Sequence, residues 1–168
     1  FIRTWLKRKR LKHVAEVTRV RRERQVLARR LHVEVGVTRE RYQAGERLDL
    51  IYVNADTTKV LEFYRPSTFD LIVTDAPYGV KHGSRTVGQA LDRSPLDLLR
   101  AAAPSWARLL RVGGALGLSW NTNVARREAA AEVLADAGLE PVESGPYLAF
   151  SHRVDQAIVR DVLVARRR

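Results

Sequence analysis

Apolar and polar positions repeat along this chain with two periods, one typical of strands and one typical of helices. Strand-like alternation or short apolar runs lie at 31–37, 48–54, 69–73, 115–120, 139–143 and 158–165. Helical spacing of apolar residues is found at 1–20, 57–63, 94–110 and 124–137. Beyond the first segment, strands and helices alternate. This order predicts an α/β fold with a mainly parallel sheet, an antiparallel last strand and helices on both faces.

Residues 69–80, FDLIVTDAPYGV, form an apolar strand that ends in a loop with an acid, a proline, an aromatic ring and a glycine. In open α/β sheets, ligands bind beyond the carboxyl ends of the strands. The loop that begins at Asp75 is therefore the first candidate for a functional site. Taken in isolation, the same residues also fit a strand-terminating turn with a packed tyrosine.

Composition limits the possible classes of protein. With 168 residues and 45% hydrophobic content, the chain can bury the core of one globular domain. It has no apolar run of membrane-spanning length, no secretory signal and no cysteine. The lack of cysteine excludes disulfides and cysteine-ligated zinc and is consistent with a cytoplasmic protein. The histidines are scattered, so no metal site is expected, and His13 and His32 are expected to be structural.

Positive charge is concentrated at the start of the chain. Of the net charge of +11, residues 1–30 contribute twelve Lys or Arg against two Glu. Lysine and arginine neutralise phosphates, so this segment favours a nucleic-acid partner, with Lys7, Arg8, Lys9 and Arg10 as candidate contacts. A solvated, charged helix face is the alternative.

Four segments together resemble one enzyme family: TDAPYGVKHG at 74–83, RSPLDLL at 93–99, GLSWN at 117–121 and HRVDQAIVRD at 152–161. The first resembles the (Asp/Asn)-Pro-Pro-(Tyr/Phe) motif of enzymes that methylate exocyclic amines of nucleobases. The ordered set is similar to tRNA guanosine-N2 methyltransferases of the class I S-adenosylmethionine-dependent group, in the branch whose members often carry a THUMP domain. The resemblance covers most of the chain and implies a Rossmann-like sheet.

The resemblance assigns the chemistry to Asp75, Ala76, Pro77 and Tyr78. An exocyclic amine is a poor nucleophile, and acceptors on its hydrogens direct its lone pair at the methyl sulfonium. Asp75 and the carbonyl of Ala76 would be these acceptors, Pro77 would hold that carbonyl outward, and Tyr78 would stack on the flipped base. Gly79, which has no side chain, would let the backbone leave the site without obstructing it. Alanine at 76 departs from the usual proline, and we expect looser positioning of the amine.

The resemblance also implies S-adenosylmethionine as cofactor, with adenine contacts from Asp56, Thr57 and, more weakly, Asn54. Capping of the following helix by Asp56 or Thr57 is the alternative. Lys81 and His82 would lie beside the base pocket or in a solvated loop, and Asn121 at a later strand end could close one wall.

A complete enzyme of this family carries a glycine-rich loop under the methionine part of the cofactor, and this sequence contains none. The sequence begins with Phe1 and has no methionine, so we expect an N-terminally incomplete fragment that is inactive alone. Residues 1–47 would form a basic helix with a strand and turn, and residues 48–168 the catalytic half of a single methyltransferase domain. We expect the remaining sheet to be split or rearranged around the gap, with 31–37 or 48–54 in the vacant position.

The sequence thus predicts methylation of an exocyclic base amine in nucleic acid, most specifically guanosine N2 of tRNA, in RNA modification and tRNA processing. Two alternatives remain open: a DNA adenine-N6 or cytosine-N4 methyltransferase, and a non-catalytic RNA-binding fragment. RNA, and tRNA in particular, is the expected partner. Neither a membrane nor a metal is expected.

Overall fold

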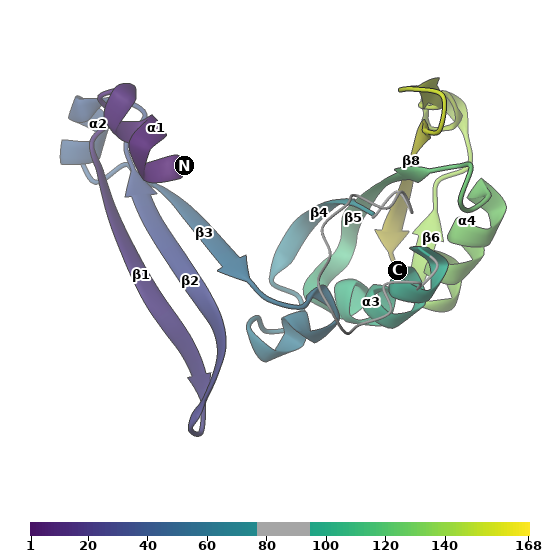
Figure 1. Cartoon of the computed structure of the whole chain (residues 1–168), viewed down its shortest axis with the longest axis horizontal. Helices are drawn as coiled ribbons and strands as arrows, with labels where there is room; N and C mark the ends of the chain where they lie inside the picture. Colours follow the sequence, from purple (N-terminus) through teal and green to yellow (C-terminus); the bar gives the residue numbers. More distant parts are fainter. Residues whose placement is uncertain (77–94) are drawn as a thin grey trace. The chain divides into compact units, whose positions relative to one another are not determined.

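The computed structural model describes residues 1–76 and 95–168. It divides the chain into two compact units, Phe1–Asp56 and Thr57–Arg168, each with its own sheet (Figure 1). The division follows Asp56 and not residue 47, because the strand at 48–54 belongs to the sheet of the first unit.

The first unit is a three-stranded antiparallel sheet in the order β1-β2-β3. The strands are β1 (His13–Arg22), β2 (Gln25–Val35) and β3 (Leu48–Asn54), and the helices are α1 (Ile2–Arg8) and α2 (Arg39–Gln43). Leu6 of α1 packs on Val33 and Val35 of β2 to form the core of this unit. In Figure 1, both helices lie at the end of the sheet away from the β1–β2 turn.

The predicted helix over 1–20 is correct only for its first turns, since α1 ends at Arg8 and β1 begins at His13. The helix stops where Arg10 takes a φ of 53°, and the amides of Arg10 and Leu11 bond back to the last turn. Four of the ten residues of β1 are β-branched, which favours a strand when a partner strand is at hand.

The second unit holds a five-stranded mixed sheet in the order β4-β5-β8-β6, with β7 paired to β8. The strands are β4 (Phe69–Asp75), β5 (Leu110–Asn121), β6 (Leu139–Pro141), β7 (His152–Arg153) and β8 (Val159–Arg167). In the described ranges only the β4–β5 pair is parallel. The prediction of a mainly parallel sheet is therefore wrong: β8 runs antiparallel to β5, β6 and β7, and 31–37 and 48–54 contribute to the other sheet.

The helices of the second unit are α3 (Pro95–Leu109) and α4 (Arg127–Asp136), with short 3₁₀ helices η1 (Thr57–Glu62) and η2 (Gly145–Leu148). Helices α3 and α4 share one core with alternate residues of β5 and β8, including Leu116, Leu118 and Leu163. On the other face of β4, Leu71 and Val73 are 59% and 77% exposed. The described helices thus cover one face, not the two that were predicted. None of them is long and apolar enough to cross a membrane.

Candidate functional site

The carboxyl ends of β4 and β5 lie side by side, because these two strands pair in parallel. Asp75, the last residue of β4, is in register with Ser119 of β5. The amide of Ala76 then donates to the carbonyl of Ser119 over 2.8 Å, which extends the pairing by one residue. This bond fixes the start of the loop that carries the predicted methylation motif.

A hollow of about 300 Å³ lies at this end of the sheet. Its polar lining consists of Thr57, Thr74 and Asp75, and Asp75 is the only ionisable residue among its described lining residues. The remaining lining is apolar: Ala76, Pro95, Leu96, Leu98, Leu99, Trp106, Leu118, Trp120, Ala125 and Ala130. An apolar cleft with few polar groups is typical of sites for small organic molecules or for a single base.

Thr57 is held at this hollow by helix α3. The indole Nε1 of Trp106 donates to Thr57 Oγ1 over 3.0 Å, and Ser105 Oγ donates to the carbonyl of Thr58 over 3.4 Å. The start of η1 is thereby tied to the C-terminal half of α3, and Thr57 and Asp75 line one cavity although they come from different elements. Sequence reasoning had selected both residues, but not the helix that joins them.

Asn54 and Asp56, the other two predicted cofactor contacts, belong to the first unit. Asn54 is the last residue of β3 and pairs with Arg29 of β2. It therefore does not end a strand of the sheet that carries Asp75, as the sequence had suggested. Of the three predicted adenine contacts, only Thr57 lies on the described hollow.

Asn121 is buried at the end of β5, where its side chain bonds to the backbone before and within β8. Its Nδ2 donates to the carbonyl of Ala157 over 3.1 Å, and its Oδ1 accepts from the amides of Asn123 and Val159. These bonds anchor the start of β8 to β5, whereas a contact with substrate stays a prediction. Neighbouring Trp120 is also buried, and its indole donates to the carbonyl of Ala125 over 2.9 Å.

Several predicted site residues lie outside the described ranges: Pro77, Tyr78, Gly79, Lys81 and His82. The basic residues predicted to contact nucleic acid, Lys7 to Arg10, lie within the described ranges. Lys7 and Arg8 form the last turn of α1, Lys9 caps it, and all four residues from Lys7 to Arg10 are exposed.

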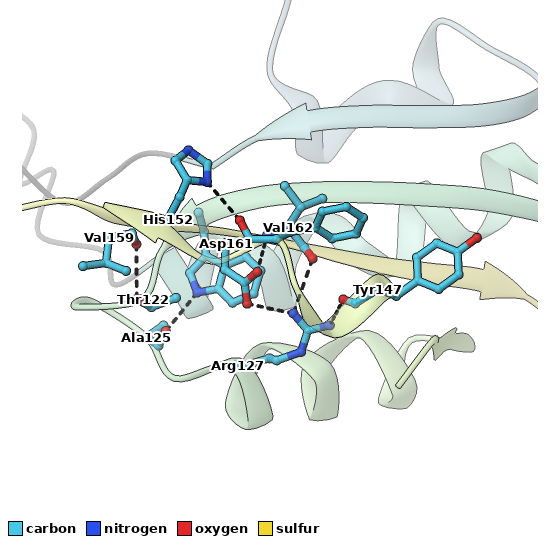
Figure 2. Close-up of polar contacts among 10 residues, drawn as sticks. Thr122, Ala125, Arg127, Tyr147, His152, Val159, Asp161 and Val162 are labelled. Atoms are coloured by element: carbon cyan, nitrogen blue, oxygen red, sulfur yellow. Dashed lines mark hydrogen bonds and ion pairs between the residues drawn. The ribbon is translucent and has the colours of Figure 1, made fainter. Parts of the chain in front are cut away.

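Sequence analysis missed one buried polar centre, at the start of α4 (Figure 2). Arg127 Nη1 lies 2.7 Å from Asp161 Oδ2, and the guanidinium also donates to the carbonyls of Val162 and Tyr147. A signal was available, because arginine in the first turn of a helix opposes the helix dipole. An arginine at such a position indicates a nearby acid.

One group of possible metal ligands occurs in the first unit, where His32, Glu34 and Asp49 place their ligand atoms within 4.8 Å of one another. His32 Nε2 is 2.7 Å from Asp49 Oδ1, and Arg47 Nη1 is 2.7 Å from Glu34 Oε2. The arginine hydrogen bond to Glu34 raises the pKa of Arg47. These contacts are a histidine–carboxylate contact between β2 and β3 and an arginine–carboxylate ion pair beside it, both partly exposed to solvent.

Neither a protein-family model nor a curated protein matches the sequence. Among solved structures, the chain is similar to a candidate DNA modification methylase from Thermus thermophilus in complex with S-adenosyl-L-methionine, at 19% identity and a TM-score of 0.45, over 67% of this chain and 53% of that chain. It is also similar to the antibiotic-resistance methyltransferase Kmr, at 17% identity and a TM-score of 0.38, over 61% of this chain and 52% of that chain.

The chain thus spans about half the length of these solved structures. Both are methyltransferases by description, but both TM-scores lie below 0.5. The case for a function therefore rests on the residues of the chain itself.

Proposed function

We propose that this chain forms the acceptor-base part of an S-adenosylmethionine-dependent methyltransferase that modifies an exocyclic amine of a nucleobase, with guanosine N2 of tRNA as the first choice of substrate. One observation carries the proposal. Asp75 and Ala76 stand at the carboxyl end of β4, on the rim of an apolar hollow, and Pro77-Tyr78-Gly79 follow directly in the sequence. A carboxylate beside an apolar cleft suits an uncharged, flat ring that carries an amine.

The proposed role of Asp75 and Ala76 is to orient the exocyclic amine of the base. The carboxylate of Asp75 accepts one amine hydrogen and the carbonyl of Ala76 accepts the other, so that the nitrogen lone pair is directed away from the ring plane. The amide of Ala76 is already bonded to Ser119, which limits the motion of the strand end. Tyr78 supplies the stacking surface, an interaction worth about 1–3 kcal/mol per base.

Of the three residues predicted to contact the adenine of S-adenosylmethionine, Thr57 lines the hollow, and Asn54 and Asp56 are not among its described lining residues. The first strand of the second unit, β4, is followed by the acidic methylation motif and not by a glycine-rich turn. We therefore assign to residues 1–168 the handling of the acceptor base, and we propose that they transfer no methyl group by themselves.

One feature supports RNA over DNA as the substrate. The segments RSPLDLL, GLSWN and HRVDQAIVRD resemble the tRNA guanosine-N2 branch, whereas the motif around Asp75 is shared with DNA amine methyltransferases. The basic first unit, with exposed Lys7 to Arg10, suits a polyanion of either kind. Nucleoside analysis of the product separates the two classes.

The test compares Asp75→Ala with Asp70→Ala in the product of the complete reading frame that contains residues 1–168. Asp70 is the second residue of the same strand, is exposed and pairs with Arg111, so its loss removes an equal charge at the end of the strand away from the motif. We expect Asp75→Ala to lower the rate of methyl transfer to tRNA by about 100-fold or more. We expect Asp70→Ala to retain the rate and Asp75→Asn to retain part of it, since an amide oxygen still accepts.

N2-methylguanosine in the digested product supports the proposal in full. N6-methyl-2′-deoxyadenosine or N4-methyl-2′-deoxycytidine from digested DNA supports the alternative substrate. Undiminished transfer by Asp75→Ala contradicts the assignment of the acceptor site.

A further inference from the structure

The sheet of the first unit has two unequal faces. On each face, directly opposed residues of β1, β2 and β3 form rows of three side chains that run across the strands. Helix α1 covers the rows around Val33 and Val35, which are buried with Leu6. Two further rows lie beyond this core: Val17–Leu31–Tyr52 and Arg19–Arg29–Asn54. We name these six residues the Tyr52 face.

The Tyr52 face is apolar and aromatic in one row and cationic in the next. Val17 and Tyr52 are 57% and 46% exposed, and Leu31 lies between them, partly buried. A shallow hollow of about 480 Å³ lies here, lined by Val17, Arg29, Leu31, Tyr52 and Asn54 with Ile51 and Val53 of the edge strand. An exposed tyrosine over an open hollow offers a flat surface to a planar ring.

The acidic residues of these strands all lie on the opposite face. Side chains alternate along a strand, and the registers place Glu16, Glu34 and Asp49 with His32 and Arg30, away from Tyr52. In strands β1 to β3, all of which the structure describes, the face with Tyr52 therefore carries no carboxylate. The carboxylates of these three strands are thus confined to one face of the sheet, whereas arginines lie on both.

Arg19 and Arg29 stand directly opposite each other on this face. Like charges in directly opposed positions destabilise a sheet. In the described part of the chain, neither arginine forms an ion pair with an acidic side chain. An anion placed between the two guanidinium groups relieves the repulsion, and a phosphate diester accepts hydrogen bonds from both.

We propose that the Tyr52 face binds an unpaired stretch of RNA, with a base stacked on Tyr52 and the adjacent phosphate between Arg19 and Arg29. A cationic row next to an aromatic, apolar row matches the alternation of phosphate and base along a single strand. A duplex hides the faces of its bases, and a free anion has no ring to stack. The choice of RNA rests on the proposed function, whereas the surface itself rests on the sheet register.

The experiment measures binding of a labelled single-stranded RNA of about 12 nucleotides, within the range of single-strand site sizes, to the full chain by fluorescence anisotropy across a salt series, without cofactor. The test variant is Arg19→Gln/Arg29→Gln. Its control, Arg30→Gln/Arg39→Gln, loses the same charge from the opposite sheet face and from α2. We expect the slope of log affinity against log salt to fall by about 0.7 in the test variant, because the contact with one phosphate is lost. The control should keep the slope of the unmodified chain.

Stacking is tested at Tyr52. Tyr52→Ala should weaken binding by about 5- to 150-fold, whereas Tyr52→Phe keeps the ring and should bind like the unmodified chain. Removing the Arg19–Arg29 repulsion should leave the melting temperature equal or higher, so a loss of binding is not a loss of fold. Arg19→Gln alone, which leaves Arg29 and the β2 strand unchanged, provides a second variant, and its change in slope should be smaller than that of the double variant.

The inference is overturned by equal slopes in the test and control double variants, by undiminished binding of Tyr52→Ala, or by a duplex that binds as tightly as the single strand. Tighter binding of DNA of the same sequence overturns the choice of RNA. The binding assay contains no cofactor, and its variants at Arg19, Arg29 and Tyr52 lie in the first unit, whereas Asp75 lies in the second. A failed methyl-transfer assay therefore leaves this test intact, and a failed binding test leaves the role of Asp75 intact.

Discussion

Arg127 Nη1 and Asp161 Oδ2 lie 2.7 Å apart, with side chains that are 16% and 7% exposed. Around this pair, Asp161 Oδ1 accepts from the amide of Val162 and Arg127 donates to the carbonyls of Val162 and Tyr147 (Figure 2). One charged centre therefore joins α4, β8 and η2. Asp161 pairs with Trp120, which directly precedes Asn121, the last residue of β5.

Removal of the Asp161 side chain should destabilise the second unit more than removal of an exposed acidic side chain. In Asp161→Ala, the Arg127 guanidinium stays buried without its counter-charge, and we expect a loss of about 3–5 kcal/mol in the free energy of unfolding. Urea denaturation followed by circular dichroism measures this. The control is Asp97→Ala, which breaks the exposed Asp97–Arg100 pair and should cost less than about 1 kcal/mol. Equal losses in both variants would show that the Arg127–Asp161 pair is solvated.

The bond between Trp106 and Thr57 should couple η1 to α3. Thr57→Val removes the acceptor of the partly buried indole N–H, and we expect a loss of about 1–3 kcal/mol in the free energy of unfolding. Trp106→Phe removes the donor, so the double variant should lose less than the sum of the two single losses. Denaturant titrations of the four proteins give the coupling energy. Strict additivity would mean that the two side chains do not interact in solution.

The Glu140–Arg168 pair predicts an acid-dependent contribution to stability. Both oxygens of Glu140 accept from Arg168, at 2.8 and 2.9 Å, and this hydrogen bond, aided by the positive charge of Arg168, lowers the pKa of Glu140 below 4.5. A lowered folded-state pKa means that the contribution is present above the ordinary pKa and is lost as the pH falls through the folded-state value.

Glu140→Gln tests this pH dependence. Its melting temperature should lie below that of the unmodified chain at about pH 7. At about pH 2 the two should be equal, because the protonated glutamate is then neutral like the glutamine that replaces it. Thermal melts across this range at low salt measure the difference. A difference that widens toward acid pH would contradict the ion-pair assignment. Since the pair is exposed, about 0.5 M salt should also reduce the difference.

The sequence predicts well where one local signal determines an element. Pro95 starts α3, and Gly138 follows α4 with a φ of 85°, which glycine adopts without strain. The strand that ends at Asp75 was equally clear, since its apolar run and its loop chemistry are contiguous. These features need no knowledge of a partner strand.

Prediction failed where distant partners decide the outcome. Val14 and Val17 are spaced as on a helix face, yet each pairs with a residue of β2 in the antiparallel sheet. A local pattern does not reveal such a partner. The strand at 48–54 was predicted correctly as a strand, but its period of two does not specify which sheet it joins. For the same reason Asn54 was grouped with Asp75, and the Arg127–Asp161 pair, which joins α4 to β8, was missed.

Residues 1–168 should bind S-adenosylmethionine only in the millimolar range or not at all, which corresponds to about −4 kcal/mol or weaker. The physical reason is that Thr57 alone among the predicted adenine contacts lines the described hollow beside Asp75. Isothermal titration calorimetry of the chain measures the affinity, and Thr57→Val serves as the control for any heat that is observed. A micromolar dissociation constant that Thr57→Val weakens would show that the hollow holds the cofactor, and the division of labour proposed above would then be wrong.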